Sequence, residues 1–129
     1  MDEVKLLLER AASKLSAAKV LLMEGYFDDA VSRAYYSMHF AARALLLTKD
    51  IAPKTHKGLI LKFGLEFIGK GFIEKTYGRA LSTAKEDRED ADYSIICEIT
   101  EEEAESVIED ADAFLKRIEE AVKEIAKET

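Results

Sequence analysis

The segment from Phe27 to Leu47, FDDAVSRAYYSMHFAARALLL, is the most apolar and most aromatic run in the chain. Read at helical spacing it gives three adjacent stripes. The first stripe has no polar member and consists of Phe27, Val31, Ala34, Met38, Ala41 and Leu45. A helix with this much apolar surface has to be covered on most of its sides. The sequence therefore predicts a central helix around which the rest of the chain packs.

Four other segments have helical periodicity. They are Asp2 to Glu24, His56 to Ile68, Phe72 to Ala91, and a last helix that begins at Thr100 and runs almost to the terminus. Three kinds of signal mark their ends: Gly25 as a stop, Thr55 as an N-cap, and a capping box from Thr100 to Glu103. Gly58 and Gly64 lower the helix propensity of the third helix, so we expect it to be short, bent or mobile.

No stretch alternates as a strand would, and residues 92–99 read as extended or irregular. The prediction is an all-α fold: an antiparallel bundle of four to five helices with no sheet. A length of 129 residues fits a single domain over residues 1–129.

The composition of the chain narrows the range of possible functions. A net charge of −7 argues against a broad basic surface for nucleic acid, although it leaves room for a small phosphate site. The chain has one cysteine, Cys97, no membrane-length apolar run and no signal peptide, so we expect a cytoplasmic protein. One cysteine and two histidines cannot build a closed zinc site, and no glycine-rich phosphate loop is present, so no metal and no cofactor is expected.

Three places could carry chemistry. Arg33 with His39 offers a phosphate-binding fork and a proton-transfer group, or, alternatively, an arginine paired with Asp29 and a histidine bonded to a buried tyrosine. Lys54 and His56, in the run KTHK, suggest an anion site at a helix N-terminus, or merely an exposed capped turn. In residues 88–93, REDADY, the arginine and the second aspartate of the run are four apart, and we favour a surface ion pair.

Several segments together resemble the HEPN superfamily, and most closely its small single-domain bacterial and archaeal members. The resemblance is carried by SRAYYSMHFAARALL (32–46), KTHKGL (54–59), YGRAL (77–81), R…ADY (88–93) and ITEEEAESVIEDADAFLKRIE (99–119). It implies a helical bundle that usually dimerises, and pairing with a small nucleotidyltransferase in toxin–antitoxin modules.

The same resemblance implies a ribonuclease motif, in which an arginine is followed after four to six residues by a histidine. Arg33 and His39 fit that spacing. On a regular helix, however, they lie about 120° apart, so the helix is irregular there, His39 acts with groups from elsewhere, or His39 is structural.

Two functions follow as hypotheses. The first is a HEPN-type protein of a nucleotidyltransferase-linked toxin–antitoxin or RNA-processing system. In it Arg33 would hold the scissile phosphate of RNA, His39 would be the general acid or base, and Lys54 and His56 would add phosphate contacts. The second is a non-catalytic helical homodimer that binds a nucleotide or a partner protein.

Overall fold

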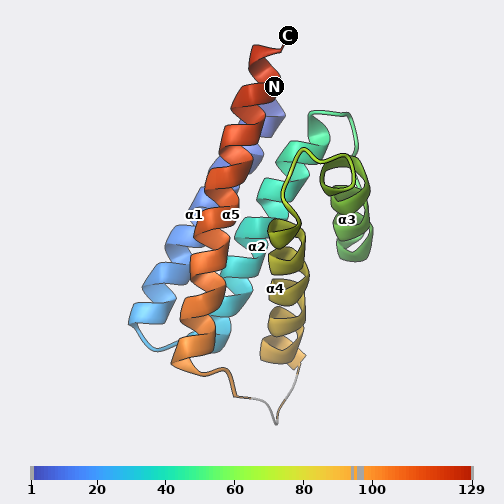
Figure 1. Ribbon diagram of the computed structural model, residues 1–129. Helices are drawn as coiled ribbons and strands as arrows, with labels where there is room; N and C mark the ends of the chain where they lie inside the picture. The colour runs from blue at the N-terminus through green and yellow to red at the C-terminus, as the bar shows by residue number, and fades with distance from the viewer. Residues whose placement is uncertain (1, 94, 96–97, 129) are drawn as a thin grey trace.

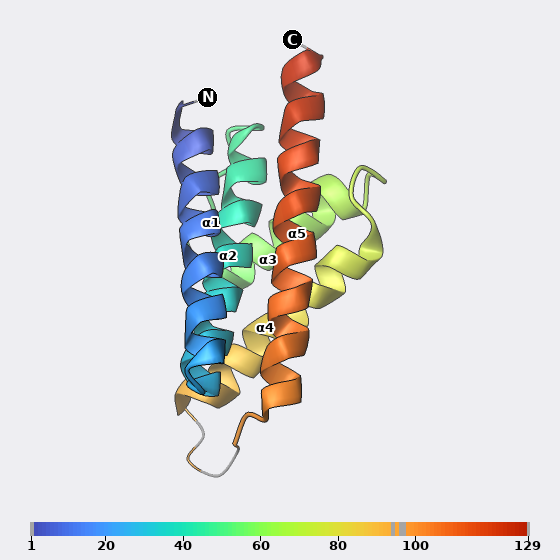
Figure 2. The same cartoon turned by 90° about the vertical axis from the view of Figure 1, so that its left-hand side faces the viewer.

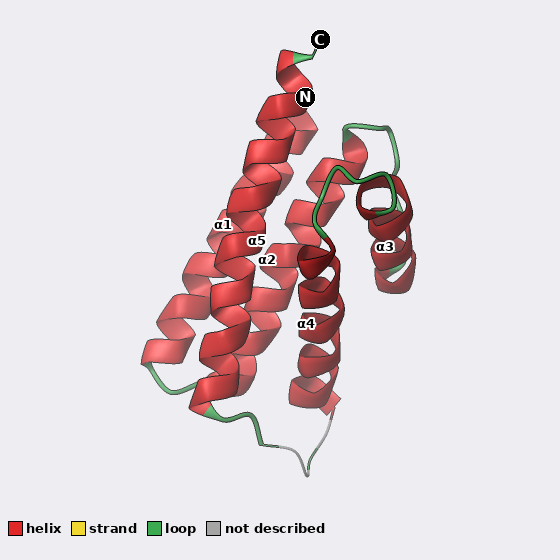
Figure 3. Cartoon of the chain, viewed as in Figure 1, coloured by secondary structure: helices red, strands yellow, loops and turns green. Residues whose placement is uncertain are grey.

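The structure is a computed structural model, and it describes residues 2–93, 95 and 98–128. Five α-helices follow one another in the described part of the chain: α1 (Asp2–Met23), α2 (Phe27–Leu47), α3 (His56–Phe63), α4 (Lys75–Tyr93) and α5 (Glu101–Lys127). A short π-helical segment, η1 (Gly64–Ile68), continues α3. The described residues contain helices, turns and loops but no strand, which confirms the all-α prediction (Figure 3).

Helices α1, α2 and α5 lie side by side along one direction, and α4 is inclined to them (Figures 1 and 2). Helix α2 contacts α1, α3, α4 and α5, which confirms its predicted central place. Its first stripe is fully buried at Val31, Ala34, Met38, Ala41 and Leu45. The alanines let neighbouring helices come close, because they carry no side chain beyond Cβ.

The α1–α2 hairpin follows directly from local sequence. Gly25 has φ +86°, a left-handed conformation that glycine adopts without strain, and it ends α1 as predicted. Farther along the hairpin, the buried Ser37 hydroxyl donates a 2.8 Å hydrogen bond to the Ala11 carbonyl oxygen. This bond ties the centres of the two helices together and leaves the hydroxyl satisfied inside the core.

The third helix changes its winding at the second glycine. Residues 56–63 are α-helical, and the amide of Gly69 then donates to the carbonyl of Gly64 at 2.7 Å, closing an i→i+5 turn. The helix expected to be short, bent or mobile is a short α-helix of 8 residues with a π-helical continuation, and together they cover the predicted residues, His56 to Ile68.

The predicted start of the fourth helix was wrong by three residues. It begins at Lys75 and not at Phe72, because the amides of Phe72 and Ile73 both donate to the Phe67 carbonyl and fold the chain back on η1. Arg117 of α5 holds this turn by donating to the Phe72 carbonyl at 2.9 Å and to Glu74 at 2.8 Å.

The end of this helix was also misplaced. Helix α4 runs on to Tyr93, so the first two residues of the predicted irregular stretch are helical. Residues 94, 96 and 97 of that stretch, Cys97 included, lie outside the described residues.

Both predicted caps are present. The Thr55 hydroxyl accepts from the Gly58 amide at 2.9 Å, and the Thr100 hydroxyl accepts from the Glu103 amide at 3.1 Å. The Glu103 carboxylate, expected to reach the Thr100 amide, instead accepts from the Thr100 hydroxyl at 3.1 Å. The caps fix where α3 and α5 begin, and the first of them positions His56.

Candidate functional site

Five side chains from three helices meet where α3 crosses α2 and α4. Tyr35, Tyr36 and His39 come from α2, His56 is the first residue of α3, and Arg88 comes from α4. The two imidazole rings are stacked, with centroids 4.5 Å apart and planes inclined by 25°. The Tyr35 ring also stacks on His56, at 5.6 Å and 24°. We call these five residues the histidine cluster.

Tyr35 fixes the orientation of His56. Its hydroxyl lies 2.5 Å from Nδ1 of His56. Burial raises the pKa of Tyr35 to about 12, so the phenol keeps its proton at neutral pH. We assign the hydroxyl as donor and Nδ1 as acceptor, which leaves the proton of neutral His56 on Nε2. The second ring nitrogen of His56 is then an N–H donor.

His39 stacks against His56 and is more deeply buried than His56. Burial, followed by the positive charges of a protonated His56 and of Arg43 and Arg88, lowers the pKa of His39 to about 4. Its Nδ1 is buried and has no hydrogen-bond partner. At neutral pH His39 is therefore an uncharged imidazole. The pKa of His56 is lowered as well, by burial and then by Arg88 and Lys85.

Arg88 links α4 to both tyrosines. Its guanidinium donates to the Tyr36 hydroxyl at 2.9 Å and lies 5.2 Å from the Tyr36 ring centroid and 5.8 Å from that of Tyr35. The predicted ion pair with Asp92 is present at 3.0 Å, although Nε is not aligned for a hydrogen bond. Asp92 accepts in turn from the Ser32 hydroxyl at 2.7 Å. The Arg88 side chain is only 16% exposed, so it belongs to the cluster and not to an open surface.

A depression of about 640 Å³ opens beside the histidine cluster. Its lining residues are His56, Lys57, Lys85, Arg88, Glu89, Asp90 and Tyr93. One of its lysines, Lys85, is paired with Glu89 at 2.6 Å. Three cationic side chains and an imidazole N–H are donors suited to an anion such as a phosphate.

The structure brings two of the four predicted site residues together. His39 and His56, expected in separate places, stack on one another. Arg33 is exposed on α2 and Lys54 is exposed before α3, and neither side chain has a hydrogen bond or ion pair with any other described residue. The alternative pair of Arg33 with Asp29 is thus not formed. The histidine bonded to a buried tyrosine is His56, and not His39.

Sequence reasoning missed the part that Arg88 plays. A surface pair with Asp92 accounted for this arginine without any tertiary contact. The available signal was the segment R…ADY (88–93), which already carried part of the HEPN resemblance. Tyr35 and Tyr36, beside Arg33 in the motif, were a second signal.

Two kinds of feature are absent from the described residues. No group of three or more histidine, cysteine, aspartate or glutamate side chains among them is arranged to hold a metal ion. Within the same part of the chain, no helix combines the length and the apolarity needed to cross a membrane.

The protein is an all-α helical bundle whose histidine cluster lies between the central helix α2 and the helices α3 and α4. A family model described as the HEPN domain matches residues 4–121. The chain belongs to the HEPN family, which confirms the resemblance seen in its sequence.

The relatives come from archaea and bacteria. A Methanocaldococcus jannaschii protein named "Putative toxin MJ0605" is 48% identical over 96% of this chain and 92% of its own length. A second protein of that organism, named "Putative toxin MJ0142", is 38% identical over 89% of this chain and 78% of its own length. A "UPF0332 protein" of Thermotoga maritima is 32% identical over 92% of this chain and 89% of its own length.

Proposed function

We propose that this protein is a toxin-like HEPN protein that cleaves RNA without a metal ion, at the histidine cluster and the depression beside it. The observation that carries the proposal is the stacked pair His39–His56 at the edge of a depression lined by three cations and two carboxylates, with Arg88 held against the rings of the neighbouring tyrosines. Membership of the HEPN family and two relatives named as toxins support a role of this kind.

The chemistry needs only groups that the chain supplies. A base removes the proton of the 2′-hydroxyl, the oxygen attacks the adjacent phosphorus, and the bond from phosphorus to the 5′-oxygen breaks. An acid protonates that leaving oxygen, so the products are a 2′,3′-cyclic phosphate and a 5′-hydroxyl. DNA lacks the 2′-hydroxyl and resists.

His56 and Arg88 are our candidates for the groups that touch the RNA. His56 lines the depression and its Nε2–H can donate to a phosphate oxygen or to the leaving oxygen. Arg88 and Lys57 line it as well and would neutralise the phosphate charge. The negative phosphate would raise the pKa of His56, opposing the effect of burial.

The roles expected of the other predicted residues stay predictions. His39 would act as general acid or base together with His56, against which it stacks. Arg33 and Lys54 are exposed outside the cluster, so each would contact RNA that extends beyond the depression. In a dimer, Arg33 could also serve the site of a second copy.

We also propose the partners that the family resemblance implies. The protein would form a homodimer through the region of α2 and work in the cytoplasm, with a small nucleotidyltransferase as its partner in a toxin–antitoxin module. Light scattering at micromolar concentration that gives the mass of one chain would contradict the dimer.

One observation favours a second function. The pKa of His39 is about 4 and that of His56 is also lowered, so both imidazoles of the free protein are neutral at pH 7 and neither is a ready proton donor. A non-catalytic module that binds a nucleotide or a partner protein would need only the depression beside the histidine cluster and the cations that line it.

Cleavage of a mixed RNA pool in the presence of a chelator separates the two functions. We expect the wild-type protein to leave cyclic phosphate ends, and His39→Ala, His56→Ala and Arg88→Ala each to reduce the rate by about 10²–10⁴-fold. Arg79→Ala, which removes an exposed arginine of α4 outside the depression, is the matched control. If no variant differs from the wild type, or if nothing is cleaved at high enzyme concentration, the ribonuclease proposal fails. Nucleotide binding that depends on Arg88 would then support the second function.

A further inference from the structure

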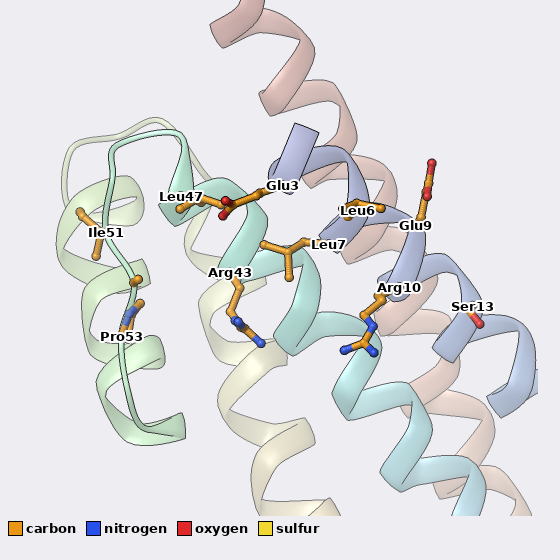
Figure 4. A pocket seen from close by; sticks show the side chains of 11 residues that line it. Glu3, Leu6, Leu7, Glu9, Arg10, Ser13, Arg43, Leu47, Ile51 and Pro53 are labelled. Carbon is orange, nitrogen blue, oxygen red and sulfur yellow. The ribbon is translucent and has the colours of Figure 1, made fainter. Parts of the chain in front are cut away.

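A second concave surface lies between α1 and the end of α2. It has a volume of about 590 Å³. Its apolar lining comes from Leu6 and Leu7 of α1, Leu47 of α2, and Ile51 and Pro53 of the loop that follows α2 (Figure 4). Leu6 is 60% exposed, so much of its apolar surface is open to an occupant of the groove. We call this surface the α1–α2 groove.

Two arginines stand at one end of the groove. Arg10 and Arg43 both line it, and their guanidinium carbons lie 5.5 and 5.6 Å from the ring centroid of Phe40. Neither arginine side chain has an ion pair or a hydrogen bond with another described residue. The ring attracts both cations and holds them in place without neutralising their charge.

The groove is electrically polarised along its length. Two carboxylates also line it, but Glu3 reaches toward Leu47 at the opposite end, and Glu9 points away from the groove (Figure 4). Arg10 and Arg43 point together toward the other end (Figure 4). A matching occupant is therefore apolar in its middle and negative where it meets the two arginines.

We propose that the α1–α2 groove binds an amphipathic helical segment of an acidic partner protein. Its apolar side chains would pack on Leu6, Leu47 and Ile51, as helices do in apolar grooves, and its carboxylates would pair with Arg10 and Arg43. Charge complementarity selects this occupant. The groove and the depression share no lining residue, so this binding does not depend on ribonuclease activity.

Other occupants fit the groove less well. A symmetric contact with a second copy places the same patch on both sides, so the two arginines of each copy would share the single carboxylate of Glu3 at the opposite end of the other copy's groove. RNA would set its phosphates against Glu3, and would leave the leucines without apolar partners. An acidic helix satisfies both arginines and covers the exposed Leu6.

The test uses two fluorescent synthetic helical peptides of roughly 16 residues, long enough for measurable helix formation in water. Both have leucines at helical spacing on one face; the other face carries glutamates in one peptide and lysines in the other. We expect fluorescence anisotropy to show the glutamate peptide binding wild-type protein roughly tenfold more tightly than the lysine peptide. The double variant Arg10→Glu/Arg43→Glu should reverse that preference. Arg79→Glu, which changes the charge of an exposed arginine on α4, should leave it as in the wild type.

Hydrogen exchange shows where the peptide binds. Protection by the glutamate peptide should fall on residues 3–13 and 43–53. Several results would overturn the inference: no binding by either peptide, equal binding of both, or protection elsewhere. It is also overturned if single-stranded RNA competes with the peptide for the groove. A wild-type dimer that becomes monomeric in the double variant would assign the groove to a second copy instead. Thermal melts check that each variant is folded.

Discussion

The imidazole rings of His39 and His56 stack at 4.5 Å although one belongs to the middle of α2 and the other begins α3. A proton on either ring places a positive charge beside the other ring and near Arg88. Both effects add to burial, so the folded protein favours the uncharged pair. The stack thus makes the stability of the fold depend on pH.

The first prediction is a loss of stability in mild acid. The pKa of His39 is about 4 in the folded protein and near 6.5 in the unfolded chain, so between these values the unfolded chain binds the extra proton. The free energy of unfolding should therefore fall as the pH drops from about 6.5 to about 4. Urea unfolding at a series of pH values measures it.

The control for this prediction is His39→Phe, which keeps an aromatic ring beside His56 and removes the titrating group. Its stability should depend less on pH over that window. An unchanged pH dependence would mean that His39 is not the group responsible.

A second prediction concerns Arg88. Removing it with Arg88→Ala takes away the charged donor to Tyr36 and leaves Asp92 without its cation, at a cost of about 1–3 kcal/mol in the free energy of unfolding. Arg88→Lys should rescue little, since an ammonium lacks the planar fork that reaches Tyr36 and Asp92 together. Arg79→Ala should change stability by less than about 0.5 kcal/mol. Equal stability of Arg88→Ala and Arg79→Ala would contradict the linking role.

Our third prediction compares the two threonine caps. Thr100→Ala should lower the global free energy of unfolding by about 1 kcal/mol, because α5 is packed against α1, α2 and α4. Thr55→Ala removes an equivalent bond from α3, a helix of eight residues, and should act locally. We expect faster amide exchange over residues 56–63 and altered nuclear magnetic resonance signals from His56. Global destabilisation by Thr55→Ala as large as that by Thr100→Ala would refute this local effect.

The fourth prediction tests the interior of the α1–α2 hairpin. Ser37→Ala removes the buried hydrogen bond to Ala11 and should cost about 1 kcal/mol. Ser37→Leu should lower the free energy of unfolding further, by about 1–3 kcal/mol, because Ser37 is fully buried and the packed helices leave no room for a larger side chain. Ser16→Ala on the exposed side of α1 is the control and should be nearly neutral. Thermal unfolding that does not separate Ser37→Leu from Ser16→Ala would exclude a tight contact at this point.

Much of the fold could be predicted because local signals decided it. The apolar stripe and its flanks predicted α2 at the bounds that the structure has, Phe27 to Leu47, and both threonine caps lie where the sequence put them. The start of α4 was not predictable from periodicity. It depends on Arg117 and on two amides that bond to Phe67, contacts between residues distant in sequence or separated by a turn.

The candidate site was half predictable for a related reason. Helical geometry showed that Arg33 and His39 point in different directions, and the structure leaves Arg33 exposed. It could not show that α3 folds back to set His56 against His39. Arg88 was hidden by its own ion pair with Asp92, which a spacing of four residues on one helix explains without any tertiary contact.

The π-helical segment η1 marks a place where the length of the chain can change. A turn closed by an i→i+5 bond, as between Gly64 and Gly69, holds one residue more than an α-helical turn. Losing one residue from this segment would restore an α-helical turn and leave the downstream residues nearly in the same phase, because the wider turn already absorbs one extra residue. Insertions and deletions of single residues among the homologues should therefore gather here, and they should leave the turn that Arg117 holds unchanged.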